Sequence, residues 1–424
     1  MTGLSAAEPA GLLRFATAGS VDDGKSTLIG RLLYDSKSVF QDQLAAVEQT
    51  SADRGDDYTN LALLTDGLRA EREQGITIDV AYRYFSTPAR SFIVADTPGH
   101  VQYTRNMVTG ASTADLALVL VDARKGVVEQ TRRHASLSAL LRVPHLVLAV
   151  NKMDLVDFDR RVYDDIVADF RFFASALNLP DVTPIPMTAL HGDNVVHRSE
   201  RIDWYYGPAL LEHLEQVHVS REDAQLRPAR FPVQYVIRPM STERPDYRGY
   251  AGTLAAGILR IGDEVVALPS GRRSTVAALD TFDGPLAEAV AGQAFTVRLS
   301  DEIDVSRGDM LVAAEGGPLV TSSFDATICW MADAPLRPGQ RVLIKHTTRT
   351  VKAQVSALHD RLDVTQLVPE AADSLRLNDI GRVTVRTASP LALDPYRHDR
   401  TTGAFIVIDD ATGTTVGAGM VAAS

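Results

Sequence analysis

The sequence predicts an α/β domain with a mostly parallel sheet and helices on both faces, followed by β-rich domains that begin with a small antiparallel barrel. Short apolar runs alternate with longer amphipathic ones between residues 12 and 217, which indicates a parallel sheet covered by helices. From residue 231 onward the runs become short and are punctuated by Gly and Pro. The third observation is a Gly-x-x-x-x-Gly-Lys-Ser spacing from Gly19 to Ser26, typical of a loop that closes on nucleotide phosphates.

Composition sets broad limits on the protein's class. A chain of 424 residues, 45% hydrophobic and 23% charged, is expected to form two to four globular domains. The net charge of -11 argues against non-specific binding of nucleic acid. Cys329 is the one cysteine, which excludes an internal disulfide and a cysteine-built metal site. Without a leader pattern or an apolar stretch of membrane-spanning length, we expect a cytoplasmic protein that does not contact membranes.

The first domain is assigned to residues 1–217. We expect its strands at residues 12–16, 76–85, 91–96, 116–122, 145–151 and 183–187, and its helices at 27–33, 103–110, 131–141 and 159–177. The long segment between residues 34 and 74 is too polar to be core, so a switch segment is favoured. Ligands of such sheets bind at the carboxyl ends of the strands, where the loops discussed below begin.

The β-rich part follows a charged, Pro-containing linker at residues 218–230. A barrel is assigned to residues 231–320, with strands expected at 231–237, 250–259, 263–268, 274–279 and 294–299. The Gly-Gly-Pro sequence at 316–318 opens a further β-rich domain, residues 321–424. Its expected strands are 326–331, 341–346, 350–357, 381–387 and 404–409.

The phosphate loop supplies the first group of candidate site residues, namely Gly19, Ser20, Val21, Asp22, Asp23, Gly24, Lys25, Ser26 and Thr27. Small residues let the main chain approach the phosphates, and backbone N–H groups at the start of a helix favour anions. Lys25 is expected to meet the β- and γ-phosphates. Ser26 is expected to offer its hydroxyl to Mg²⁺.

A second candidate motif, Asp96-Thr97-Pro98-Gly99-His100, follows an apolar strand. Asp96 can hold Mg²⁺, and the Gly99 N–H can meet a γ-phosphate. His100 is placed to orient an attacking water. Thr77, at the end of the long insertion, is the candidate second hydroxyl on Mg²⁺, released after hydrolysis. His100, Thr77 and Lys25 are therefore the predicted catalytic residues.

A third motif predicts selectivity for guanine. The Asp154 carboxylate can accept from the N1–H and the amino group of guanine together, whereas adenine lacks that pair of donors. Asn151 is expected to bridge toward N7 and pin the loop, and the stem of Lys152 to cover the base. In the sequence Thr188-Ala189-Leu190, the Ala189 N–H is a candidate partner for guanine O6.

Together these motifs resemble a translation-factor GTPase followed by two antiparallel β-barrels, the layout of elongation factor Tu. The chain is more specifically similar to the GTPase subunits of bacterial sulfate adenylyltransferase. Stretches that carry this closer resemblance are Leu32-Leu33-Tyr34-Asp35-Ser36-Lys37, residues 60–79 from Asn60 to Asp79, Arg248-Gly249-Tyr250-Ala251-Gly252 and Lys345-His346-Thr347-Thr348-Arg349-Thr350.

The resemblance implies a function shared between two chains. A catalytic adenylyltransferase partner would form adenylyl sulfate and pyrophosphate from ATP and sulfate, while this subunit hydrolyses GTP with Mg²⁺ to drive that step. The expected assembly is a hetero-oligomer, and no residue here is assigned to sulfate. Some relatives carry an adenylyl-sulfate kinase domain, which we expect to be absent because no second phosphate loop follows.

Two departures and two rival functions accompany this interpretation. Elongation factors carry histidine where this sequence has Asp23, a carboxylate that would repel phosphates unless it points outward. Thr188 stands where serine is commoner. The rivals are an elongation factor-type GTPase that binds aminoacyl-tRNA, which predicts a basic RNA-binding surface, and a GTP-binding scaffold without turnover.

Overall fold

The computed structural model describes residues 10–38, 41–54, 59–64, 79–99, 104–177, 179, 181–219, 222–239, 247–363 and 368–423. These divide into two compact units, the first ending at Val219 and the second holding the described residues that follow. Within the described part of the chain, no helix has the length and apolar composition needed to cross a membrane.

The first unit is an α/β domain built on one six-stranded sheet. The strands lie in the order β2-β3-β1-β4-β5-β6, and only β2 runs antiparallel to its neighbour. The strand bounds are β1 Ala10–Ala18, β2 Ala81–Ser86, β3 Arg90–Asp96, β4 Leu116–Asp122, β5 His145–Asn151 and β6 Val182–Pro186.

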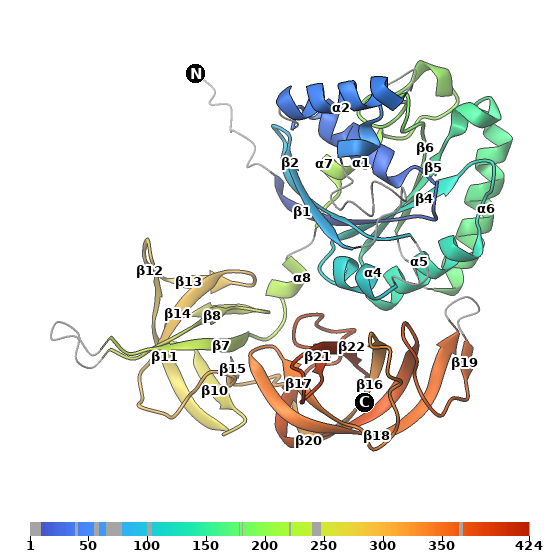
Figure 1. Ribbon diagram of the computed structural model, residues 1–424. Coiled ribbons are helices and arrows are strands. Elements are labelled where there is room, and N and C mark those ends of the chain that lie inside the picture. Colours follow the sequence, from blue (N-terminus) through green and yellow to red (C-terminus); the bar gives the residue numbers. More distant parts are fainter. Residues whose placement is uncertain are drawn as a thin grey trace, which may run out of the picture. The chain divides into compact units, whose positions relative to one another are not determined.

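Helices cover both faces of this sheet, with α1 and α7 on one face and α4 and α5 on the other (Figure 1). Their bounds are α1 Lys25–Asp35, α2 Gln41–Arg54, α4 Thr104–Ala111, α5 Glu129–Leu140, α6 Arg160–Ala176 and α7 Leu210–Gln216, with 3₁₀ turns η1 Leu61–Leu64, η3 Met153–Val156 and η4 Glu200–Ile202. All seven residues of β4 are buried, which explains its unbroken apolar sequence in the centre of the sheet.

The start of β2 differs from the sequence prediction. A strand was expected at residues 76–85, but 79–80 precede the strand, which begins at Ala81, while 76–78 lie outside the described residues. Ala81 pairs with Asp96, the last residue of β3. Because β3 ends at Asp96, residues 79–80 have no further β3 residue to pair with.

The second unit contains two closed antiparallel barrels of six strands each, counted over its described residues. In the first, β10-β15-β7-β8-β14-β11 closes through a β10–β11 pairing, and in the second, β17-β21-β22-β16-β20-β18 closes through β17–β18. The first-barrel segments are α8 Glu222–Gln225, β7 Arg230–Ile237, β8 Gly249–Thr253, β9 Ile258–Arg260, β10 Glu264–Leu268, β11 Arg272–Thr281, β12 Gly284–Leu286, β13 Glu288–Val290, β14 Ala294–Leu299 and β15 Met310–Ala313.

The second barrel comprises β16 Leu319–Trp330, β17 Arg341–His346, β18 Arg349–Asp363, β19 Val368–Glu370, β20 Ile380–Leu393, β21 Ala404–Ile408 and β22 Thr415–Val421. The expected fold class, a parallel α/β domain followed by two antiparallel barrels, is confirmed. Each barrel closes over its own apolar core, centred on residues such as Phe231 and Tyr250 in the first and Trp330 and Phe405 in the second.

The single strand expected at residues 250–259 is wrong, because the chain turns between β8 and β9. Gly257 has a φ of 83°, and a Cβ there would lie 2.5 Å from the Ala229 Cα, so only glycine fits. No strand was predicted for the residues of β22, which include Gly417 and Gly419. A Cβ on Gly419 would lie 2.1 Å from the Phe405 ring, so this glycine makes room for packing rather than ending a strand.

Candidate nucleotide-binding site

The phosphate loop connects β1 to α1, so its backbone N–H groups precede a helix N-terminus. Asp22 and Gly24 have φ values of 71° and 91°, in the left-handed region. A Cβ at position 24 would lie 2.4 Å from the Asn151 Nδ2, so a side chain is excluded there on two grounds. Left-handed residues of this kind also occur in loops whose backbone N–H groups bind anions, and phosphate binding by this loop stays a prediction.

Lys25 and Asp96 meet at the carboxyl ends of β1 and β3. Their side chains are 8% and 3% exposed, and the Lys25 ammonium pairs with the Asp96 Oδ1. Thr17 donates to the same oxygen at 3.4 Å, and Thr97 donates to the Thr17 carbonyl at 2.6 Å. A buried carboxylate is thus held beside the phosphate loop, and the Lys25 ammonium balances its charge.

Asp23 does not point out to solvent, as a phosphate loop seemed to require. The residue is 2% exposed, and its Oδ2 accepts the Ser20 N–H at 2.7 Å. Burial raises the pKa of Asp23 to about 6, although the Ser20 N–H and two lysines act in the opposite direction. The carboxyl closes the turn of the loop instead of facing the solvent side of the site.

Asn151 joins the phosphate loop to the candidate guanine loop. Its Nδ2 donates to the Asp23 carbonyl at 2.7 Å, and its Oδ1 accepts the Ala189 N–H at 2.8 Å. Both ends of the amide are therefore engaged by the protein, in keeping with a pinning role. The Ala189 N–H that was expected to meet guanine O6 has this amide oxygen as its partner here.

Lys152 lies across the same edge of the sheet in a left-handed conformation, φ 64°. Its ammonium is 3.0 Å from the Asp122 Oδ2 and also donates to the Asp22 carbonyl. Burial alone would raise the pKa of Asp122, but hydrogen bonds from Arg124 and Lys152 outweigh it and hold the pKa below its usual range. Asp122 thus fixes the Lys152 ammonium, and the role of the Lys152 stem in covering the base stays a prediction.

Asp154 lies in the first turn of η3 with a side chain 19% exposed, and its Oδ2 is 3.8 Å from the His191 Nε2. Beside it, the Thr188–Leu190 loop is braced from two sides. Asp193 accepts the Thr188 hydroxyl at 2.5 Å and is itself held by Arg201.

Arg31 completes the brace from α1. Its guanidinium donates to the carbonyls of Ala189 at 3.3 Å and Leu190 at 2.5 Å. The sequence did not predict Arg31, Asp193 and Arg201, because residues that brace a loop carry no motif. The burial of Asp193 is visible only in the structure.

Gly99 lies against the phosphate loop, since a Cβ there would be 2.2 Å from the Gly19 carbonyl oxygen. Gln130 on α5 donates to the Gly99 carbonyl at 2.8 Å, and its Nε2 is 2.8 Å from the His134 Nε2. Burial, with Arg133 and Lys25 nearby, lowers the pKa of His134 to about 3, so the ring is neutral and can accept that contact. This Gln130–His134 pair was also missed.

The predicted residues Thr77 and His100 lie outside the described residues, so their roles stay predictions. Of the others, Ser20 and Val21 lie in the loop after β1, Ser26 and Thr27 lie in the first turn of α1, and Pro98 follows β3. Phosphate loop, Asp96 and guanine motif therefore share one edge of the sheet, as the sequence analysis expected.

Comparisons with known proteins agree with this geometry. Residues 11–223 match the family model described as "Elongation factor Tu GTP binding domain", and residues 323–422 match "GTP-eEF1A C-terminal domain-like". The protein named "Sulfate adenylyltransferase subunit 1" from Aeromonas salmonicida (strain A449) is 54% identical over 420 residues, which cover 99% of this chain and 88% of that protein. The chain belongs to the sulfate adenylyltransferase subunit 1 family.

Another similar protein is longer than this chain. "Bifunctional enzyme CysN/CysC" from Mycobacterium tuberculosis (strain ATCC 25618 / H37Rv) is 61% identical over 412 residues, which cover 97% of this chain and 67% of that protein. A solved structure of sup35 complexed with GDP aligns with 98% of this chain and 94% of its own, at 23% identity and a TM-score of 0.44. The family name identifies its members as subunits, and this one carries a GTPase domain.

Proposed function

We propose that this chain is the GTPase subunit of a sulfate adenylyltransferase and that it hydrolyses GTP to drive adenylyl sulfate synthesis by a catalytic partner. The observation that carries the proposal is the link made by Asn151 between the phosphate loop and the loop at Ala189. One side chain thereby holds a phosphate cradle and a guanine-selecting motif in a single site. Identity of 54% to a named subunit 1 supports the choice of reaction.

Magnesium fits the residues that would hold it. Asp96 is 2% exposed, and its carboxylate oxygens are hard ligands that would take the metal in exchange for the Lys25 ammonium. Ser26, in the first turn of α1, and Thr77 would supply hydroxyl oxygens, the hard ligands that Mg²⁺ prefers. When bound, Mg²⁺ would neutralise charge on the β- and γ-phosphates.

Nucleotide binding requires the Lys25–Asp96 ion pair to be exchanged. The Lys25 ammonium would leave Asp96 and bind the β- and γ-phosphates. The Asp96 carboxylate would then be free to hold Mg²⁺. Gly99 would place its N–H near the γ-phosphate, since it lies against Gly19 at the head of the phosphate loop. His100, next in sequence, would orient the attacking water.

Discrimination for guanine rests on Asp154. With its carboxylate 19% exposed and held at the edge of the sheet, it would accept the two guanine donors, while Lys152, fixed by Asp122, covers the ring. A nucleotide without those donors leaves a desolvated carboxylate without hydrogen bonds, which makes the rejection of adenine steep.

Coupling to a partner requires GTP and GDP to stabilise different conformations that the partner binds unequally. The rival function, an elongation factor that binds aminoacyl-tRNA, shares the fold and the GTP chemistry. The 54% identity to a sulfate adenylyltransferase subunit 1, over 99% of this chain, does not favour it.

The test measures GTP turnover by the purified chain alone, with the catalytic subunit, and with that subunit plus ATP and sulfate. We expect slow hydrolysis alone and the fastest hydrolysis in the complete mixture. Aminoacyl-tRNA serves as the comparison additive and should leave the rate unchanged. Stimulation by aminoacyl-tRNA, or indifference to the catalytic subunit, would contradict the proposed function.

A further inference from the structure

A pocket of about 600 Å³ lies within the barrel unit, and none of the described residues that line it is among those assigned to GTP. Three chain segments and Ala256 form it: residues 227–230 at the start of β7, residues 316–319 at the start of β16, and residues 393–399 at and after the end of β20. Its volume is in the range of pockets that bury a small molecule or a few peptide residues.

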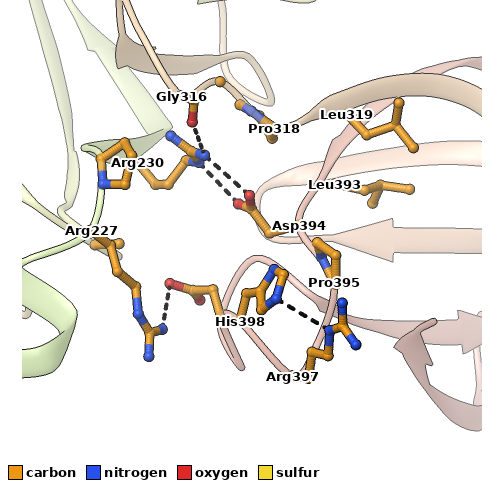
Figure 2. A pocket seen from close by; sticks show the side chains of 14 residues that line it. Arg227, Arg230, Gly316, Pro318, Leu319, Leu393, Asp394, Pro395, Arg397 and His398 are labelled. Carbon is orange, nitrogen blue, oxygen red and sulfur yellow. Dashed lines mark hydrogen bonds and ion pairs between the residues drawn. The ribbon is translucent and has the colours of Figure 1, made fainter. Parts of the chain in front are cut away.

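One side of the pocket is occupied by a structural ion pair. Arg230 is 5% exposed and binds Asp394 through two nitrogens, at 2.9 and 3.1 Å, and the Gly316 carbonyl at 2.6 Å (Figure 2). Asp394 also accepts the Thr402 hydroxyl at 2.7 Å. The charges of this pair are satisfied by the protein, so the pair joins the two barrels rather than binding a ligand.

The second carboxylate of the pocket is also engaged. Asp399 is 5% exposed, and its Oδ1 accepts the N–H groups of Thr401 and Thr402 at 2.8 and 2.9 Å. Its Oδ2 is 3.5 Å from the Arg227 guanidinium. Neither acid of the pocket is therefore available to neutralise a further cation.

The other two arginines that line the pocket, Arg227 and Arg397, take no part in the Arg230–Asp394 ion pair. Arg227 has a side chain 41% exposed and makes that single long contact with Asp399. Arg397 donates through its Nε to the His398 Nε2 at 3.2 Å, and among the described residues it forms no ion pair. Figure 2 shows Arg227, His398 and Arg397 together on the side of the pocket away from Arg230. This side is cationic in a chain whose net charge is -11.

The remaining wall is apolar and not aromatic. Pro318, Leu393 and Pro395 line it together with Leu319, which is 52% exposed. Nucleotide bases in proteins stack mostly on aromatic rings, and none of the described residues that line this pocket is Phe, Tyr or Trp. A carboxylate beside an aliphatic side chain fits both the guanidinium groups and this wall.

We propose that this pocket receives an extended segment of the catalytic partner subunit, one that carries a carboxylate next to an aliphatic side chain. The inference rests on the proposed function, because that function supplies the partner. The guanidinium donors of Arg227 and Arg397 bind the carboxylate, and Leu319 and Pro395 contact the aliphatic group.

The experiment compares complexes formed with the catalytic subunit by the wild-type chain, by Arg227→Glu/Arg397→Glu, and by the control Arg260→Glu/Arg273→Glu. The control reverses two exposed arginines of the first barrel that do not line the pocket. Sedimentation gives the dissociation constant of each complex at low and high salt, and a separate titration gives GTP affinity.

We expect the pocket variant to bind the partner at least about tenfold more weakly, with less dependence on salt and with unchanged GTP affinity. The control should bind like the wild type. Wild-type binding by the pocket variant, or equal loss in the control, overturns the inference. A further titration measures the binding of inorganic sulfate and of adenylyl sulfate to the wild-type chain and to the pocket variant. The inference is also overturned if the pocket variant no longer binds one of these anions but still binds the partner like the wild type. If the wild-type chain fails to bind the partner, the proposed function itself fails.

Discussion

At the scale of single residues, the candidate site depends on side chains that hold loops rather than on side chains that face a ligand. Asn151 connects the loop at Asp23, 128 residues before it, to the loop at Ala189, 38 residues after it. Asp122 holds the Lys152 ammonium, and Asp193 holds the Thr188 hydroxyl. Substitutions of Asn151, Asp122 and Asp193 should lower nucleotide affinity by displacing the loops that they hold. Substitution of Asp154 should lower it by removing hydrogen bonds to guanine.

Asp154→Asn is expected to exchange guanine for xanthine selectivity. The amide can donate to the extra oxygen of xanthine but cannot accept both guanine donors, so GTP should bind about 100-fold more weakly, a cost of about 3 kcal/mol. Titration calorimetry with GTP and xanthosine triphosphate measures both affinities. Unchanged GTP affinity would refute the role assigned to Asp154.

Gln130→Ala is expected to weaken GTP binding about tenfold and GDP binding far less. Gln130 holds the Gly99 carbonyl at 2.8 Å while Gly99 lies against the phosphate loop, and only GTP has a γ-phosphate for the Gly99 N–H. Fluorescent nucleotide titrations give the ratio of the two dissociation constants. Arg132→Ala, on the same helix with an exposed ion pair to Asp169, is the control. Equal weakening of GTP and GDP would count against this role.

Asp23→Asn is expected to change how stability depends on pH. Burial raises the pKa of Asp23 from 3.8 to about 6, so its protonated form favours folding below pH 4 and this contribution is lost as pH rises through 6. The loss amounts to about 3 kcal/mol at most. Urea unfolding should find the variant more stable than the wild type at pH 7.5, with little difference at pH 4. A difference that is independent of pH would exclude Asp23 as its source.

Sequence motifs predicted candidate site residues only where the bound nucleotide fixes the spacing between the residues of the motif. The phosphate loop and the Asn151–Asp154 motif could be read from the chain because nucleotide geometry fixes them. Gln130 and Arg31 could not, because their partners are backbone carbonyls from other elements, which any nearby donor can satisfy.

At the scale of elements, the sequence predicted the buried parallel strands better than the barrel strands. The apolar periods located β3, β4 and β5 to within a residue, since buried parallel strands read as continuous apolar runs. The barrel strands were less predictable: Gly257 breaks an apparent strand, while Gly419 sits inside a real one. Whether a glycine turns the chain or makes room for a ring depends on contacts that pattern alone does not show.

Arg90→Ala is expected to loosen α7 from the sheet. The Arg90 guanidinium, in a residue 6% exposed, donates to the Gly11 carbonyl and to the carbonyls of Leu214, Glu215 and Val217 at the end of α7. Leaving those acceptors without a partner should cost about 3 kcal/mol in the free energy of unfolding. Urea denaturation of the whole chain measures this loss.

Arg160→Ala removes an exposed arginine from α6 and serves as the control, with an expected change within about 0.5 kcal/mol. If Arg90→Ala falls in the same range as this control, α7 does not depend on Arg90.

At the scale of the whole molecule, the chain combines a nucleotide domain whose site lies at one sheet edge with a barrel unit stiffened by the Arg230–Asp394 pair. Such an arrangement suits energy coupling, because hydrolysis at one unit can change how a partner is held by the other. Coupling also makes a demand that simple activation does not. GTP must move the equilibrium of adenylyl sulfate formation, not only the rate at which it is reached.

The most direct test measures the final amount of adenylyl sulfate formed by the complex from ATP and sulfate, with GTP or with a non-hydrolysable GTP analogue. Our account predicts that GTP raises the yield above the equilibrium reached without guanine nucleotide, and that the yield falls back when GTP is exhausted. The analogue should leave the yield at that equilibrium. Equal yields with GTP and the analogue would contradict the claim that this chain couples GTP hydrolysis to sulfate activation.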